Sequence, residues 1–140
     1  YPPMSTPRGW YPAACYAQVN NEPRIYVCGG STSTTSLSSC EYLSILTKTW
    51  YTITSMNTPR GYAAGVLLPD GASFVVCGGW SGGSLATCEK LTLTSNTWSS
   101  NVANMTTIRY AHAAVLYKTK MVVIYKLLSC VWETASLSGH

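Results

Sequence analysis

Six cysteines, two histidines and five carboxylates are the side chains in this 140-residue sequence best suited to chemistry. Nucleophilic catalysis needs a base within hydrogen-bond reach of the nucleophile, and the two imidazoles belong to His112 and His140. His112 falls inside an expected strand, where it fits core packing, and His140 is the last residue of the sequence. No GxSxG, HExxH or phosphate-binding loop occurs. The sequence therefore predicts a non-catalytic protein with no cofactor and no metal site.

The elements that would position these side chains recur along the chain at intervals of about 50 residues. An apolar run ends in Cys-Gly-Gly at residues 28–30 and again at residues 77–79. A Met-x-x-x-Arg motif occurs at residues 4–8 and 56–60, and in a looser form at residues 105–109. The chain is therefore expected to contain several copies of one structural unit.

Each of the first two units contains four short runs with the character of β-strands, separated by turn residues. They lie near 11–18, 24–28, 39–46 and 49–54 in the first unit, and near 62–68, 73–77, 87–93 and 97–101 in the second. No segment has a helical period of useful length. The fold class is therefore expected to be all-β.

A four-stranded unit with a Gly-Gly doublet, a Glu-x-Leu motif and a downstream Trp resembles the kelch-repeat β-propeller family over nearly the whole chain. The resemblance implies antiparallel blades in which the doublet ends the second strand and the Trp packs between blades. The doublets are Gly29 with Gly30 and Gly78 with Gly79, and the packing aromatics are Trp50 and Trp98. Where the family usually has a Tyr two residues after the Glu, this chain has Leu43 and Leu91.

The resemblance divides the chain into four parts. Residues 1–10 would be the end of a preceding blade and a linker, 11–56 blade 1, 57–105 blade 2, and 106–140 a partial, irregular blade 3. In the third part Tyr125-Lys126-Leu127 stands where Cys-Gly-Gly is expected. About three blades are too few to close a ring, which takes 4–8. We therefore expect an incomplete or open propeller.

In such a blade the second strand ends beside the start of the third, which brings Cys28 near Cys40 and Cys77 near Cys88. Each disulfide would close a loop of about a dozen residues and stabilise the fold by about 3 kcal/mol. Buried free thiols are one alternative, and a metal site is another that the absence of CxxC spacing disfavours. Two cysteines are left, Cys15 and Cys130, which could pair with each other, bridge to another chain or stay free.

Disulfides would indicate an extracellular or luminal compartment. Asn104-Met105-Thr106 fits the N-glycosylation pattern and lies in an expected loop. The run from Ser31 to Ser39 is almost entirely Ser and Thr. It fits a flexible, solvated loop, with O-glycosylation as the alternative.

Charged side chains recur with the repeat as well: Arg8, Arg60 and Arg109, together with Glu41 and Glu89. One equivalent per blade argues for structural ion pairs that tie adjacent blades, with ligand contact on the channel face as the alternative. Trp80 follows the second doublet outside the repeated Trp position. It is expected to be either an exposed binding anchor or a packing residue of its loop.

Only 10% of the residues are charged, and the basic residues behind the net charge of +4 are scattered, which disfavours nucleic-acid binding. No apolar run approaches the ~20 residues that span a bilayer. We expect a secreted module that binds protein or glycan. One alternative is a structural subunit of an extracellular fibre or coat assembled from blades. A second is a cytosolic kelch substrate adaptor of a ubiquitin ligase, which the cysteine pairs disfavour.

Overall fold

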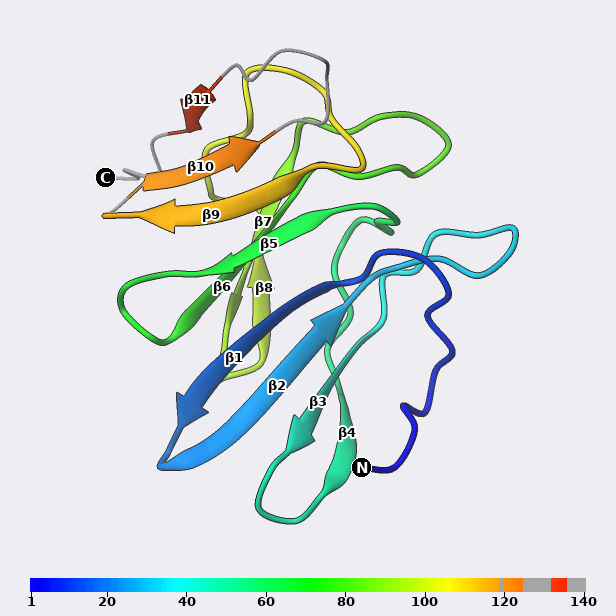
Figure 1. Cartoon of the computed structure of the whole chain (residues 1–140), viewed down its shortest axis with the longest axis vertical. Helices are drawn as coiled ribbons and strands as arrows, with labels where there is room; N and C mark the ends of the chain where they lie inside the picture. Colours follow the sequence, from blue (N-terminus) through cyan, green and yellow to red (C-terminus); the bar gives the residue numbers. More distant parts are fainter. Residues whose placement is uncertain (119, 125–131, 136–140) are drawn as a thin grey trace.

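The computed structural model describes residues 1–118, 120–124 and 132–135, which form three antiparallel β-sheets (Figure 1). Blade 1 comprises β1 (Ala13–Val19), β2 (Glu22–Cys28), β3 (Cys40–Ser44) and β4 (Thr49–Ile53). Blade 2 comprises β5 (Ala64–Leu67), β6 (Ser73–Cys77), β7 (Cys88–Thr92) and β8 (Thr97–Ser99). Blade 3 comprises β9 (Ala113–Tyr117), β10 (Lys120–Ile124) and β11 (Trp132–Ala135).

Both four-stranded blades pair their strands in chain order, as expected for the all-β repeat. The described residues contain no helix, and so none that could cross a membrane. The first strands β1, β5 and β9 are neighbours, and the described sheets do not close into a ring (Figure 1). The prediction of all-β blades in an open arrangement is confirmed.

The turn between β1 and β2 shows how local sequence sets the register of blade 1. Asn20 and Asn21 have φ values of 52° and 63°, and Val19 pairs directly with Glu22. A two-residue hairpin with two positive φ values favours Asn, whose short polar side chain tolerates this conformation. The turn therefore fixes which face of β1 and β2 carries each side chain.

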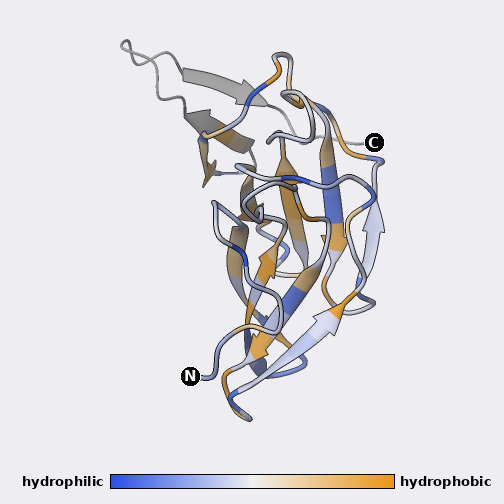
Figure 2. Cartoon of the chain, turned by 90° about the vertical axis from the view of Figure 1, so that its right-hand side faces the viewer, coloured by the Kyte–Doolittle hydropathy of each residue, from blue (hydrophilic) through white to orange (hydrophobic). Residues whose placement is uncertain are grey.

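The larger core lies between blades 1 and 2, where small side chains on blade 1 meet large ones on blade 2. Ala13 and Ala17 of β1 are buried, as are Phe74 and Val76 of β6. A side chain on Gly65 of β5 would place its Cβ 2.6 Å from the Phe74 ring, so a glycine is needed at this close approach. Figure 2 shows the apolar residues mainly on the strands, while most loops are pale or blue.

A second core fills the space between blades 2 and 3. Val66, Val75 and Cys77 of blade 2 pack there with Met105 and Met121. Blade 2 is therefore buried on both faces, and its strand β6 is buried along its whole length. This explains why β6 reads as a continuous apolar run.

Candidate functional site

Each Gly-Gly doublet directly follows the second strand of its blade and contacts the backbone of the next repeat. Gly78 and Gly79 have φ values of 65° and 96°, which other residues rarely adopt. A Cβ on Gly78 would lie 2.7 Å from the carbonyl oxygen of Arg109 in the next repeat. Gly29 and Gly30 have the same left-handed backbone. The doublets thus let the strand ends and the connecting segments pack closely.

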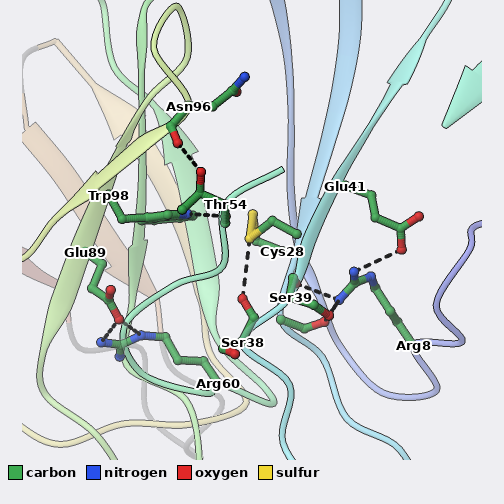
Figure 3. The surroundings of a disulfide bond; sticks show 12 residues. Arg8, Cys28, Ser38, Ser39, Glu41, Thr54, Arg60, Glu89, Asn96 and Trp98 are labelled. Atoms are coloured by element: carbon green, nitrogen blue, oxygen red, sulfur yellow. Dashed lines mark hydrogen bonds and ion pairs between the residues drawn. A yellow bond between two sulfur atoms is a disulfide. The ribbon is translucent and has the colours of Figure 1, made fainter. Parts of the chain in front are cut away.

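The repeated arginines and glutamates form buried ion pairs beside these doublets (Figure 3). The guanidinium of Arg60 contacts Glu89 at 3.1 Å and donates hydrogen bonds to the carbonyls of Gly78 and Thr87, both at 2.8 Å. Backbone N–H groups of the connecting segment donate to both oxygens of Glu89, at 2.7 and 3.0 Å. The pair therefore has the partners that burial of charge requires.

Arg8 and Glu41 repeat this arrangement in blade 1, at 3.0 Å. Burial by itself raises the pKa of Glu41, but hydrogen bonds from Ser5, Arg8 and Thr6 hold that pKa below its usual value. Arg109, the third of the series, is also buried. None of the three arginines offers an exposed positive charge to a ligand.

Each ion pair forms within its own repeat, although we expected the pairs to connect adjacent blades. The connection is made instead by the backbone of the arginine. The N–H of Gly30 in blade 1 donates to the carbonyl of Arg60, and the N–H of Arg60 donates to the carbonyl of Leu37, both at 2.9 Å. In the same way the N–H of Gly79 donates to the carbonyl of Arg109 at 2.7 Å. Arg60 thus joins its own blade by its side chain and the preceding blade by its backbone.

The repeated tryptophans contact the chain segments that precede their blades. The indole N–H of Trp98 donates to the carbonyl of Thr54, at the end of blade 1 (Figure 3). The indole N–H of Trp50 donates to the carbonyl of Pro2, and both bonds are 2.9 Å long. Both tryptophans are partly buried. Their place in the structure suits the packing role that the repeat pattern predicted.

The structure contains the two disulfides Cys28–Cys40 and Cys77–Cys88. In each pair the cysteines face each other directly across two neighbouring strands. Cys15 bonds to no described cysteine, and burial raises the pKa of its thiol to about 12. Cys130 lies outside the described residues, so its pairing stays a prediction.

Two further expected sites lie in loops. Asn104 is exposed, and its side-chain oxygen accepts a hydrogen bond from the N–H of Cys88 at 3.1 Å. Glycosylation of Asn104 stays a prediction. Within the Ser/Thr run, Thr32 and Thr35 are joined by three hydrogen bonds, and Ser31 is buried. Among the described residues no group of three or more His, Cys, Asp or Glu is placed to hold a metal ion.

A cluster of five aromatic residues, four of them exposed, lies at the end of the blades where the β2–β3 and β6–β7 loops project (Figure 1). This aromatic cluster consists of Trp10, Tyr11, Tyr62, Trp80 and Tyr110. Tyr62 is central, with its ring centroid 6.5 Å from Trp10, 5.1 Å from Tyr11 and 6.4 Å from Tyr110. Trp80 lies 5.5 Å from Tyr110. The cluster therefore connects segments from all three blades.

Backbone geometry fixes the central rings of the aromatic cluster. Tyr11 and Tyr62 precede the first strands of blades 1 and 2 and have φ values of 45° and 56°. Aromatic residues rarely adopt this conformation, which costs about 1–3 kcal/mol and tends to occur at functional sites. The backbone of Trp80 is held by two hydrogen bonds with Gly61, at 2.7 and 3.1 Å.

A pocket of about 180 Å³ opens between Trp10 and Trp80. Tyr62 forms part of its wall, and the six residues from Ser31 to Ser36 form the rest. No charged residue lines it. The hydroxyl of Ser36 donates to the carbonyl of Trp80 at 2.6 Å and so joins the two sides. The buried hydroxyl of Ser31 has no hydrogen-bond partner.

The sequence indicated only part of this site. Trp80 was identified as a candidate anchor, and the structure places it 42% exposed at the edge of the pocket. Trp10, Tyr11, Tyr62 and Tyr110 were missed. The available signal was that an aromatic residue follows the repeated arginine by one to three positions in every copy.

The comparison with protein families gives a match to the model described as Kelch motif over residues 14–57. The matched range begins in β1 and ends just after β4. Blade 2 repeats its strand order, its disulfide and its buried ion pair. No curated protein matched the chain.

Proposed function

We propose that this chain, in which residues 14–57 match the Kelch motif, is a non-catalytic extracellular module that binds another protein through the loop end of its blades. Kelch repeats generally mediate protein interactions, but fold alone does not identify the binding surface. The aromatic cluster is the observation that supports this choice of surface.

Exposed Trp and Tyr side chains are the residues most enriched at the energetic centres of protein interfaces. Four side chains of the aromatic cluster are between 42% and 66% exposed, and Tyr62 is half-buried. Because strained backbone and short hydrogen bonds hold these rings, little conformational entropy is lost when a partner covers them. A contiguous aromatic surface on a rigid support is therefore suited to bind a partner.

The two disulfides support the extracellular part of the proposal. Reducing compartments keep such cysteine pairs open, so two bridges at equivalent positions favour an oxidising environment. We expect at most two of the six cysteines to react with iodoacetamide in the native protein and all six after reduction, as counted by intact mass. Four or more reactive cysteines without reductant would contradict an extracellular location and favour the cytosolic adaptor.

The binding surface is tested by capturing extracellular proteins on the immobilised full chain and quantifying them by mass spectrometry. The double variant Trp10→Ala with Trp80→Ala should lose the specific partner. Leu46→Ala is the matched control, because Leu46 is 68% exposed but lies in the β3–β4 turn at the opposite end of blade 1. Unchanged capture by the double variant would show that the aromatic cluster is not the binding surface. Absence of any specific partner would contradict an interaction module.

Assembly between blades is a second candidate function, favoured by one face of blade 1. Val76, Phe74 and Leu91 of blade 2 pack against blade 1. The equivalent face of blade 1 carries Tyr16, which is 54% exposed. If copies associate through this face, Tyr16→Arg should reduce the mass measured by light scattering. A monomer at all concentrations for both wild type and variant would contradict assembly.

A further inference from the structure

We propose that the pocket between Trp10 and Trp80 binds a proline-rich segment of the partner in the polyproline II conformation. The proposal rests on the proposed function, since it names the kind of segment that the aromatic cluster recognises. Four features of the described residues support it: the spacing of the rings, the free hydrogen-bond donors, the absence of charge and the way the chain holds its own prolines.

The spacing of the rings matches an extended proline-rich chain. Successive ring centroids from Trp10 through Tyr62 and Tyr110 to Trp80 are 6.5, 6.4 and 5.5 Å apart. Polyproline II rises 3.1 Å per residue, so each step between rings corresponds to about two residues. Proline-rich segments bind in grooves lined by aromatic rings, because the conformation is already formed and little entropy is lost. The cluster supplies rings at this spacing, of which Trp10, Tyr62 and Trp80 line the pocket.

The pocket also offers donors for the carbonyl groups of such a segment. Polyproline II makes no internal hydrogen bonds, and proline has no N–H, so its carbonyls need donors from the partner. The indole N–H groups of Trp10 and Trp80 donate to no described residue, and the buried hydroxyl of Ser31 has no partner either. Ser33 and Thr34 add exposed hydroxyls on one wall. Several hydrogen-bond donors of the pocket therefore have no acceptor among the described residues.

Charge excludes an acidic or phosphorylated segment. The residues that line the pocket are all Trp, Tyr, Ser or Thr. The nearest repeated cations, Arg8 and Arg60, are buried, and their guanidinium groups bond to Glu41 and Glu89. Recognition of phosphate or acidic motifs needs accessible arginines, which this pocket lacks. A neutral, apolar segment with free carbonyls suits it better.

The chain already holds a proline-containing segment of its own by an indole group. The carbonyl of Pro2 accepts the hydrogen bond from Trp50, and Pro3 follows directly. A residue before proline is restricted to extended or polyproline II conformations. This site at Trp50 lies outside the pocket, so the chain's first residues are engaged elsewhere. It shows that an indole N–H in this fold can anchor a Pro-Pro segment.

The test is a titration of the full, disulfide-bonded chain with peptides of about ten residues that contain Pro-x-x-Pro, which span roughly 30 Å. Tryptophan fluorescence and calorimetry measure the affinity. Peptides with every proline replaced by alanine are the matched control. We expect the alanine peptides to bind at least about tenfold more weakly, as do variants Trp10→Ala and Trp80→Ala. Leu46→Ala should bind like the wild type, and Trp80→Phe, which keeps a ring but loses the N–H, should lie between.

Equal binding of the proline and alanine peptides, or no binding of either, would overturn the proposal. Binding of a neutral oligosaccharide array that Trp80→Ala abolishes, without proline-peptide binding, would make the pocket a glycan site. The wider function fails separately. If capture of a partner depends on Trp10 and Trp80 but survives removal of the partner's prolines, the interaction surface stands and the polyproline ligand does not. The variants' folding is checked by thermal unfolding, which half-exposed rings should shift little.

Discussion

Glu89→Gln tests whether the buried ion pair is needed to hold blade 2 together. The substitution preserves the shape of the side chain but removes the negative charge beside Arg60, whose side chain is fully buried. The guanidinium would keep its bonds to the carbonyls of Gly78 and Thr87 but lose its counter-charge. The backbone N–H groups of Asn57 and Thr58 would then face a neutral amide instead of a carboxylate.

Removing one member of a buried pair typically costs about 3–5 kcal/mol, because the remaining charge is left in a medium of low polarity. A domain of this size has a free energy of unfolding of about 5–15 kcal/mol. We therefore expect Glu89→Gln to lower the midpoint of thermal unfolding by roughly 10 °C. The matched control is Glu22→Gln, since Glu22 and Arg24 form a pair whose side chains are 22% and 14% exposed. That variant should lose less than about 1 kcal/mol.

The assay is urea unfolding of the oxidised protein, followed by tryptophan fluorescence, for the wild type and both variants. A third variant, Arg60→Met with Glu89→Met, removes both charges. It should recover only part of the loss, because four backbone groups lose their charged partners. The reasoning would be refuted if Glu89→Gln and Glu22→Gln destabilised the protein by similar amounts of under about 1 kcal/mol.

Three further predictions follow from the fold. In urea unfolding, Gly79→Ala should lower the free energy of unfolding by at least about 2 kcal/mol, because its Cβ would meet the backbone. Gly82→Ala, at a φ of 74° but with open space around it, should lower it by about 1 kcal/mol. Equal costs of the two substitutions would contradict the close approach at Gly79. Replacing Cys77 and Cys88 by Ser should cost about 3 kcal/mol, and an unchanged urea midpoint would contradict the bridge. Burial, with help from a nearby arginine, lowers the pKa of His112 to about 4. His112 therefore binds a proton more readily in the unfolded chain, so the stability that neutral His112 contributes is present above about pH 6.5 and is lost as pH falls toward 4. His112→Gln should make the free energy of unfolding depend less on pH in this range. The same pH dependence in both proteins would exclude His112 as its cause.

The repeat carried most of what could be predicted about the fold. The spacing of the two Cys-Gly-Gly motifs, together with turn residues such as Asn20 and Asn21, indicated two four-stranded units, and the structure has them in the expected strand order. The pairing of Cys28 with Cys40 followed from the same repeat, because neighbouring strand ends must lie within reach of each other. These features depend on local sequence, where period and turn chemistry act over a few residues.

The repeat predicted the roles of the arginines only in part. Periodicity paired Arg60 with a glutamate but placed the contact between blades, whereas the ion pair with Glu89 lies inside blade 2. The link to blade 1 is made by the backbone carbonyl of Arg60 to Gly30. Every residue type has a backbone carbonyl, so this contact requires no particular residue except the glycine that allows the close approach. The repeat pattern therefore could not reveal the contact.

By itself, the sequence predicted the strands, their order within each blade and the two cysteine pairs. Only the tertiary structure decided which aromatic side chains lie together in the proposed binding surface. Trp10 precedes blade 1, whereas Tyr62 and Trp80 come from two distant segments of blade 2, and each could have been a core residue by composition alone. They come together beside residues 31–36, where the ring centroids of Trp10 and Tyr62 are 6.5 Å apart and all three residues line one pocket. Burial and exposure of an aromatic ring are set by that packing between distant segments, and not by its neighbours in the chain.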